Sequence, residues 1–176
     1  MEFGAGQTFD IEPGTFNVIV GPEHVALGLL RNAISGNRVL LLYICGNYSR
    51  IISRIGLRNA EFDVRRAFTA SQLLSIAEEA HQTFIFIEHD PTLYSESEEM
   101  AGYVSMALRE LSRSSTVVLY STEFDTHLRA ISKMADRIFC IDEVRTRPAG
   151  ARAIRTTRGR LPRFDSTEGQ SRLEGF

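Results

Sequence analysis

In TFNVIVGPEHVALGLLRNAI (residues 15–34) an apolar run of six residues is followed by Gly21 and Pro22, and then by apolar side chains at helical spacing. This pattern predicts a buried strand, a turn and an amphipathic helix. Five further apolar runs are separated by helix-like or loop segments: VLLLYI (39–44), VRRAF (64–68), TFIFIE (83–88), TVVLYS (116–121) and RIFCID (137–142). Nearly continuous apolar strands that alternate with helices are typical of parallel sheets covered on both faces. We therefore predict a three-layer α/β/α fold with a mainly parallel sheet.

The turn at Gly21 and Pro22 has the frame of a phosphate-binding loop, which reads G-x-x-x-x-G-K-[ST]. In that register the second glycine falls at Ala26, the lysine at Leu27 and the hydroxyl residue at Gly28. The only lysine of the chain, Lys133, lies far away in sequence. Since charge-assisted hydrogen bonds are worth about 1.5–3 kcal/mol each, losing both groups should weaken nucleotide binding by several powers of ten. We expect no catalytic residues, no metal site and no cofactor, with ATP and Mg²⁺ disfavoured.

A degenerate nucleotide site would lie around the same turn and the carboxyl end of a later strand. Its candidate residues are Gly21, Pro22, Glu23, His24, Gly28 and Glu88. Glu23 either occupies the anion position at the helix N-terminus or repels a phosphate brought there. Arg31 either reaches back as a substitute cation or lies on a solvated helix face. Glu88, His89 and Asp90 form either a metal or acid/base cluster at the C-terminal end of a strand, where ligands of α/β proteins usually bind, or the start of a turn at Asp90-Pro91.

The order and spacing of these segments resemble the RecA/RadA recombinase family, including its RadB and KaiC-like members, over nearly the whole chain. Residues 3–22 are similar to the family's entry into the first strand, VLLLYICGN (39–47) to its second strand, and TFIFIEHD (83–90) to its Walker B strand. TVVLYSTE (116–123) resembles the strand that ends in a polar nucleotide sensor, and the arginine-rich terminal stretch resembles the final β-hairpin. The resemblance implies a RecA-like P-loop fold with a C-terminal antiparallel hairpin.

The resemblance also assigns roles that the residues of this chain fill poorly. The acid that polarises the attacking water falls at Asn47, whose amide cannot accept a proton as a carboxylate does. The Walker B position is Glu88, and the sensor position is Glu123. Residues 124–136 are too short to be the long DNA-binding loop of the recombinases, and we expect no small N-terminal DNA-binding domain. The resemblance thus implies a catalytically inactive paralogue, an accessory or interaction protein with a protein partner or self-association, in DNA recombination or repair.

Two alternative functions stay open. One is a switch protein that binds a nucleotide without hydrolysis. The other is a DNA-binding protein that uses its C-terminal arginines, because residues 145–176 hold eight arginines against three acidic residues while residues 1–144 carry a net charge of −7. The arginines that we single out for phosphate contacts are Arg152, Arg155, Arg158 and Arg160. A solvated face or a protein contact explains the same arginines.

Length and composition favour one domain over residues 1–176, with an α/β core at 1–144 and an arginine-rich hairpin and tail at 145–176. The N-terminus lacks a basic region followed by a long apolar run, and no stretch approaches about 20 apolar residues, so we expect a soluble cytoplasmic protein without membrane contact. Cys45 and Cys140 lie in apolar runs and are expected to be buried thiols. His81 and His127 are expected at the surface.

Overall fold

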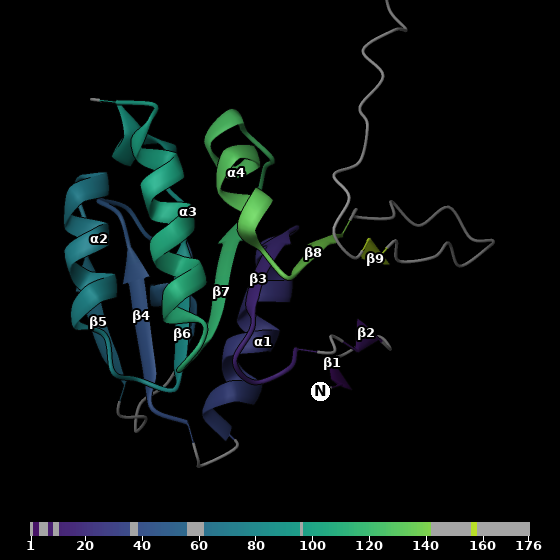
Figure 1. The fold of residues 1–176 in the computed structure, drawn as a ribbon. Coiled ribbons are helices and arrows are strands. Elements are labelled where there is room, and N and C mark those ends of the chain that lie inside the picture. Colours follow the sequence, from purple (N-terminus) through teal and green to yellow (C-terminus); the bar gives the residue numbers. More distant parts are fainter. Residues whose placement is uncertain are drawn as a thin grey trace, which may run out of the picture.

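The computed structural model describes residues 2–3, 7–8, 11–35, 39–55, 62–95, 97–141 and 156–157. Its main sheet contains six parallel strands, and all six apolar runs of the sequence supply one (Figure 1). They are β3 (Phe16–Val20), β4 (Leu41–Cys45), β5 (Asp63–Arg66), β6 (Phe84–Glu88), β7 (Thr116–Ser121) and β8 (Arg137–Cys140). Their order across the sheet is β5-β4-β6-β7-β3-β8, and β9 (Thr156–Thr157) pairs antiparallel with β8. A separate antiparallel pair joins β1 (Glu2–Phe3) and β2 (Gln7–Thr8).

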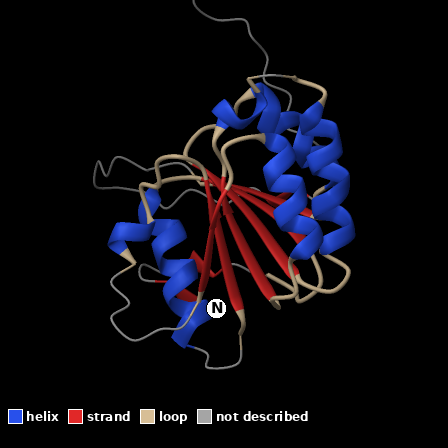
Figure 2. Cartoon of the chain, turned by 90° about the vertical axis from the view of Figure 1, so that its left-hand side faces the viewer, coloured by secondary structure: helices blue, strands red, loops and turns tan. Residues whose placement is uncertain are grey.

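Helices cover both faces of this sheet (Figure 2). Helix α1 (Glu23–Ser35) lies on one face, and α2 (Ala70–Glu79), α3 (Met100–Leu111) and α4 (Thr126–Ile131) lie on the other. Three short 3₁₀ helices, η1 (Ile52–Arg54), η2 (Pro91–Tyr94) and η3 (Ser132–Met134), lie in connections between strands. The three-layer α/β/α fold with a mainly parallel sheet, consistent with a RecA-like fold, is confirmed.

Two hydrophobic cores lie on opposite faces of the sheet, because successive side chains of a strand point to opposite sides. In β6, Phe84 and Phe86 pack with α1, whereas Ile85 and Ile87 pack with the helices of the other layer. All four residues are buried. The same alternation in β4 and β7 explains why these strands read as continuous apolar runs: both of their faces are covered.

Local capping defines the start of two helices. The Thr69 hydroxyl accepts a hydrogen bond from Gln72 N–H and caps α2, as the spacing of these residues predicts. Asp125 caps α4 in the same way, through Leu128 N–H. The similar Ser95 and Glu98 spacing gives no cap, because Ser95 ends η2 and α3 begins only at Met100.

The topology places several loops at one edge of the sheet. All six strands are parallel, so the segments that follow β3, β4, β6 and β7 leave the sheet at the same carboxyl edge. Strand β3 lies between β7 and β8, and the chain passes two strands to reach β4. Ligands of open α/β sheets bind at the carboxyl edge near such a change of direction.

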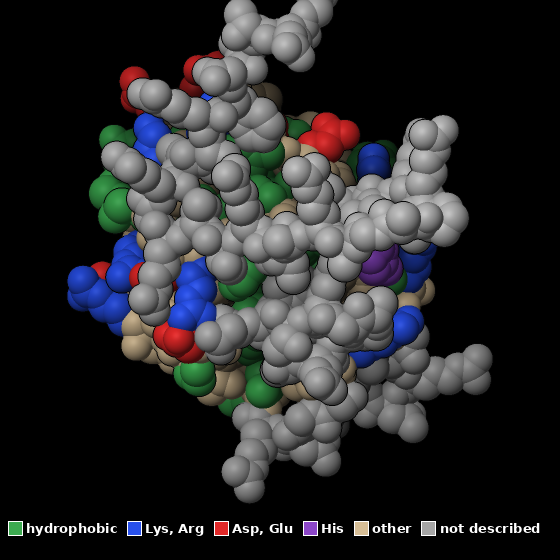
Figure 3. Space-filling model, turned by 90° about the vertical axis from the view of Figure 1, so that its right-hand side faces the viewer, with side chains coloured by type: hydrophobic (Ala, Val, Ile, Leu, Met, Phe, Trp, Pro, Cys, Tyr) green, Lys and Arg blue, Asp and Glu red, His purple; other side chains and the backbone are tan. Residues whose placement is uncertain are grey.

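On the face beyond β8, the described acidic and basic side chains that are visible lie among hydrophobic ones (Figure 3). Within the described ranges, the helices are too short or too polar to cross a bilayer.

Candidate functional site

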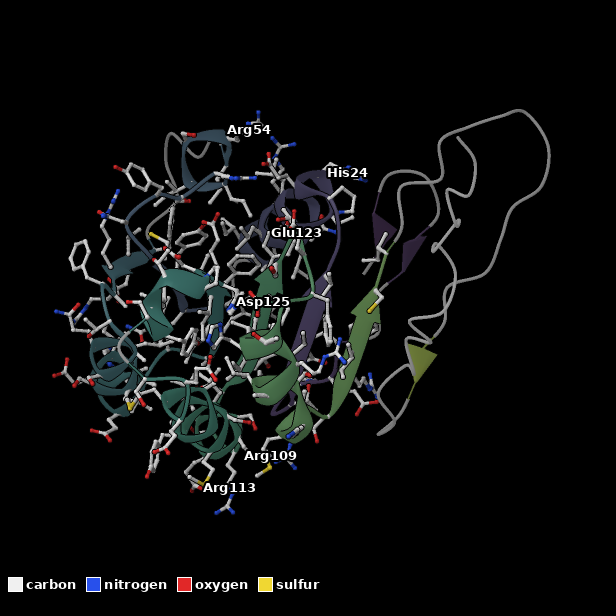
Figure 4. The ribbon with its side chains drawn as sticks, turned by 90° about the horizontal axis from the view of Figure 1, so that it is seen from above. His24, Arg54, Arg109, Arg113, Glu123 and Asp125 are labelled. Carbon is white, nitrogen blue, oxygen red and sulfur yellow. The ribbon has the colours of Figure 1, made fainter. Side chains whose placement is uncertain are left out.

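A cavity of about 580 Å³ opens at the carboxyl edge of the sheet. It is lined by the segments that follow β4, β6 and β7 and by the first residue of α1. Seen from above this edge, Glu123 and Asp125 lie over the middle of the sheet, with His24 and Arg54 toward α1 and Arg109 and Arg113 toward the opposite layer (Figure 4). The charged lining among the described residues is five carboxylates and one guanidinium: Glu23, Glu88, Asp90, Glu123, Asp125 and Arg50.

The connection from β3 to α1 is shorter than the phosphate-loop frame requires. Strand β3 ends at Val20 and α1 begins at Glu23, so only Gly21 and Pro22 lie between them. Ala26, Leu27 and Gly28 are helical, and the amides of Leu27 and Gly28 are therefore committed to bonds inside the helix. The expected loop frame over residues 21–28 is thus wrong. The sequence EHVAL holds no glycine that would interrupt a helix begun after Pro22.

Gly21 has a structural reason to be glycine that involves no phosphate. A Cβ at this position would lie 3.0 Å from Ile141 Cβ and 3.2 Å from the Ile141 carbonyl oxygen. Its carbonyl accepts a hydrogen bond from the Tyr120 hydroxyl at 2.9 Å, and its N–H donates to the Ser121 carbonyl at 3.0 Å. Gly21 therefore fixes the junction between β3, β7 and the end of β8.

The predicted residues of the helix start point in different directions. The Glu23 carboxylate lines the cavity and forms an ion pair with Arg54 of η1. His24 is exposed and lies outside the cavity lining. Leu27 packs against the core on the α1 side. Arg31 donates to the Arg54 carbonyl at 3.4 Å, so it extends toward η1 rather than back to the turn.

Glu88 is held by donors of the protein itself. Its Oε2 accepts a hydrogen bond from the Tyr43 hydroxyl at 2.5 Å, and its Oε1 accepts one from Arg50 N–H at 3.0 Å. Ser49 Oγ lies 3.0 Å from the Tyr43 oxygen and accepts from the amides of Ile51 and Ile52. Glu88 thus ties the end of β6 to the loop after β4, which gives a structural use to the residue that the resemblance places at the Walker B position.

His89 and Asp125 form a second pair at the cavity. His89 Nε2 lies 2.7 Å from Asp125 Oδ2, and the His89 side chain is only 1% exposed. Burial alone raises the pKa of Asp125, but the bonds from His89 and Leu128 N–H and the charges of His89 and His127 outweigh it, so the pKa is lowered. Because an ionised carboxylate has no proton to give, Nε2 is the donor of this bond.

A stack of rings continues from this pair into the protein. The Tyr94 ring stacks on His127 with centroids 4.9 Å apart and lies 5.9 Å from the His89 ring. Three buried polar atoms of the stack have no hydrogen-bond partner among the described residues: His89 Nδ1, the Tyr94 hydroxyl and His127 Nε2. His127 is expected at the surface and is half-buried, because its ring stacks on Tyr94 of η2. His81 is exposed, as expected.

Asp90 reaches the cavity past a glycine of the neighbouring loop. A Cβ on Gly46 would lie 2.1 Å from Asp90 Oδ2, so only glycine fits at that position. The other carboxylate oxygen, Oδ1, accepts from Thr92 N–H and from the Thr92 hydroxyl. Asp90 therefore both caps η2 and presents Oδ2 toward the loop after β4.

Carboxylates at this edge raise the pKa of the neighbouring tyrosines. Burial is the largest cause that raises the pKa of Tyr43, Tyr94 and Tyr120, and the charges of nearby carboxylates raise it further. Glu88 has this effect on Tyr43, and Glu23 and Glu88 have it on Tyr120. The pKa of Cys45 is raised, mainly by burial; the charge of Arg66 lowers it, and the charges of Glu88 and Asp90 raise it.

The remaining predicted residues lie at the cavity rim or outside the described chain. Asn47 and Glu123 line the cavity, and both are exposed. Cys45 is buried as expected, but Cys140 is exposed, because it ends β8 where the strand leaves the core. Residues 142–155 and 158–176, with Arg152, Arg155, Arg158 and Arg160, are not described, and of the expected hairpin only the pairing of β9 with β8 is seen.

Sequence analysis missed several contributors to this cavity: Tyr43, Gly46, Tyr48, Arg50 and Asp125. The position of Asp125 could have been predicted, since an aspartate three residues before Leu128 has the spacing of a helix cap. Tyr43 gave none, because it lies within an apolar run and meets Glu88 only through the pairing of β4 with β6.

A search for similar proteins finds a relative that is itself uncharacterized. An uncharacterized protein of Archaeoglobus fulgidus is 37% identical over 131 residues, which are 73% of this chain and 66% of the relative. This chain thus matches just under two thirds of the relative's length. No family model matches the sequence. The flagellar accessory protein FlaH of Methanocaldococcus jannaschii has a solved structure with a TM-score of 0.48 and 11% identity, over 78% of this chain and 73% of that one.

Proposed function

We propose that this chain is a catalytically inactive interaction protein on a RecA-like fold, which neither binds nor hydrolyses nucleoside triphosphates. The observation that carries the proposal is the start of α1 at Glu23, two residues after β3. A phosphate-binding loop surrounds phosphates with free backbone amides. Here the corresponding amides of Leu27 and Gly28 serve the helix, and the Leu27 side chain packs against a core.

The charge of the cavity supports the same proposal. Five carboxylates and one arginine line the cavity. A nucleoside triphosphate is a polyanion, so these carboxylates would repel it. In a partly enclosed site, like charges repel more strongly than in bulk water because the effective dielectric constant is lower. Glu88 also has its two oxygens bonded to Tyr43 and Arg50, which leaves it poorly suited to hold a metal-bound water.

Calorimetry with Mg-ATP and a phosphate-release assay test the proposal. We expect no saturable heat up to millimolar nucleotide and no release above the blank. Micromolar binding with turnover abolished by Glu88→Gln would refute it. The double variant Leu27→Lys/Gly28→Ser restores both missing side chains, and we expect it to remain inactive because the loop is absent. Leu27→Met/Gly28→Ala is the matched control for changes inside the helix.

A role in protein contacts is supported by exposed apolar side chains near the β5 edge of the sheet. Val64 is 41% exposed, Phe68 54% and Tyr48 86%, and the pairing of Cys45 with Arg66 brings the loops after β4 and β5 together. Apolar side chains that cluster on a surface are typical of contact sites. Sedimentation of wild type and a Phe68→Ser/Tyr48→Ser variant tests for self-association: a weight-average mass above 19.8 kDa that falls in the variant would support it.

The setting of this role rests on the resemblance to recombinases alone, which points to accessory work in DNA recombination or repair. The two alternatives, a nucleotide-binding switch and a DNA-binding protein that uses its C-terminal arginines, are supported by no observation on the described residues. A thermal shift with millimolar ATP would favour the first, and DNA binding that weakens steeply with salt would favour the second.

A further inference from the structure

We propose that this chain forms a symmetric dimer in which β5 of one protomer pairs antiparallel with β5 of a second copy. The inference rests on the proposed function and deepens it, since it names the partner of an interaction protein. Strand β5 is the last strand of the main sheet, beyond β4, and no other described strand pairs with its outer side (Figure 1). All four of its residues are exposed. An edge strand of this kind offers its backbone groups to another strand.

The backbone groups of β5 point alternately toward the sheet and toward solvent. Directly after the strand, the N–H of Ala67 donates to the Cys45 carbonyl of β4 at 2.9 Å. The N–H and C=O of one strand residue point to the same side, and that side alternates along the strand. The odd-numbered residues therefore face β4, and the N–H and C=O of Val64 and Arg66 point outward. These outward groups are the ones that a second strand can bond.

Symmetry and charge together select one register. In a dimer with a two-fold axis through the strand pair, the residue on the axis faces its own copy. With Val64 on the axis, Asp63 lies opposite the partner's Arg65 and Arg65 lies opposite the partner's Asp63. An axis at Asp63 would place two aspartates opposite each other, and an axis at Arg65 would do the same with two arginines. Like charges directly opposite are destabilising, so the register centred on Val64 is favoured.

The side chains of Asp63 and Arg65 lie on the same face of the sheet, as this register requires. Arg65 pairs with Glu79 of α2 at 3.4 Å, and Asp63 Oδ2 accepts from the Gln82 side chain just after α2 at 2.6 Å. The ion pair of Arg65 with Glu79 is weak, because the two side chains are 56% and 64% exposed. Arg65 can therefore turn to a carboxylate across the dimer at little cost.

The pairing geometry brings these charges close together. The outward backbone groups of Val64 make the two copies of this residue a hydrogen-bonded pair, so the flanking Asp63 and Arg65 pairs are of the non-hydrogen-bonded kind. Side chains approach most closely in such pairs. Val64 itself is 41% exposed in the single chain, and its side chain would pack against its copy at the axis.

The same charges explain why β5 does not pair with any strand it meets. Charged side chains on an edge strand discourage pairing with other sheets. The order Asp63-Val64-Arg65 opposes registers that bring like charges together, and it supports one antiparallel register with a second copy of itself. The edge is thus protected from unrelated strands and complementary to its own copy.

Sedimentation equilibrium of the full chain tests the inference. We expect the mass to rise from 19.8 kDa toward twice that value, with a Kd on the order of 100 µM or tighter because the interface is small. Val64→Pro removes an outward N–H without breaking a bond to β4, and it should abolish the dimer. Val64→Thr keeps the N–H and a β-branched side chain, so this matched control should still dimerise. Far-UV circular dichroism verifies that both variants are folded.

Two charge variants test the register. Asp63→Arg and Arg65→Asp each bring like charges opposite each other in both symmetry-related pairs, so each should weaken the dimer by about tenfold or more. In an equimolar mixture, the new arginine of one variant lies opposite the new aspartate of the other, and the two unchanged residues also form an opposite-charge pair. The mixture should therefore dimerise although neither variant does so alone. Arg113→Asp, on the exposed surface of α3, is the control for charge reversal away from β5 and should leave the Kd unchanged.

Three results would overturn the inference: a mass of 19.8 kDa up to about 1 mM protein, a Val64→Pro variant that dimerises as tightly as Val64→Thr, or a mixture of the charge variants that stays monomeric. If Val64→Pro does not fold, the mixture decides. A dimer that is lost in Phe68→Ser/Tyr48→Ser but kept in Val64→Pro is held by apolar side chains, and strand pairing is then refuted.

Failure of this inference is distinguishable from failure of the proposed function. If the chain is monomeric and Mg-ATP does not bind, only the dimer is refuted, and the partner of the interaction protein is a different protein. If Mg-ATP binds at micromolar concentration and is hydrolysed, the proposed function is refuted whatever the mass of the chain in solution.

Discussion

Among single residues, Glu88 has the clearest structural use at the candidate site, at the position to which the resemblance to recombinases assigns a catalytic role. A carboxylate at the end of β6 lies beside β4, and there it accepts bonds from the Tyr43 hydroxyl and Arg50 N–H. These bonds order the loop that carries Asn47, Tyr48 and Ser49. The carboxylate therefore has a structural use that needs neither metal nor nucleotide.

Glu88→Ala should lower the free energy of unfolding by about 1–3 kcal/mol, because it removes the carboxylate that accepts hydrogen bonds from the Tyr43 hydroxyl and the Arg50 amide. Urea denaturation of Glu88→Ala, Tyr43→Phe and the double variant measures this effect. The double variant should cost less than the sum of the single ones, since both remove the same bond. Strict additivity would show that the bond contributes nothing.

The lowered pKa of Asp125 predicts that the stability of the protein depends on pH. Its pKa in the folded protein is lowered, so its contribution is fully present above the ordinary aspartate value of about 3.9 and is lost as the pH falls through the lower, folded value. Asp125→Asn keeps a side-chain oxygen that caps α4 but loses the charge that faces His89. We expect a loss on the order of 1 kcal/mol at pH 7, since the carboxylate is 29% exposed.

The gap in unfolding free energy between wild type and Asp125→Asn should close as the pH falls below about 4, through the lowered pKa of Asp125. Urea titrations at several pH values measure it. A gap that widens as the pH falls below about 4 would contradict the assigned direction of the shift.

At the scale of structural elements, replacing glycine by alanine should have opposite effects on stability at two positions, Gly46 and Gly102. A Cβ at Gly46 meets Asp90 Oδ2 at 2.1 Å, whereas one at Gly102 of α3 meets nothing within 4 Å. Gly46→Ala should therefore displace the η2 cap and destabilise the protein. Gly102→Ala should stabilise it by about 0.5–1 kcal/mol, since alanine loses less entropy in a helix. Thermal unfolding of the two variants checks this, and a Gly46→Ala variant as stable as wild type would show that Asp90 can move freely.

The elements themselves were largely predictable from sequence, and their ends were less so. All six strands lie at the runs that the sequence analysis singles out. The central strands read as continuous apolar runs because both of their faces are covered, whereas β5, at the edge of the sheet, is exposed and holds two arginines. The start of α1 was missed because Gly21-Pro22 matches the phosphate-loop frame, while Glu23 to Leu27 lack the glycines that keep such a loop from becoming helical. The Ser95 and Glu98 spacing predicted a cap that the intervening η2 turn replaces.

The candidate site was less predictable than the elements, for a reason at the scale of the whole molecule. Its walls come from Gly46–Ile51, Glu88–Thr92 and Tyr120–Asp125, which are far apart in sequence and meet because β4, β6 and β7 are neighbours in the sheet. Residue spacing alone cannot give that order. The position of Lys133 also depends on the sheet and not on spacing alone. It precedes β8, so it lies at the opposite edge of the sheet from the cavity.

The two cores predict how the whole chain unfolds. Leu30 of α1 packs in one core and Leu108 of α3 in the other, and both side chains are 0% exposed. Leu30→Ala and Leu108→Ala should each cost about 2–5 kcal/mol, whereas Leu40→Ala, at a residue 62% exposed, should change stability by less than about 0.5 kcal/mol.

Because the central strands contribute side chains to both cores, neither core can melt while the other stays folded. The near-UV signal of the tyrosines and the far-UV signal of the backbone should therefore show one coincident transition in all three variants. A biphasic curve for Leu30→Ala would instead show that α1 and its core unfold independently of α2, α3 and α4.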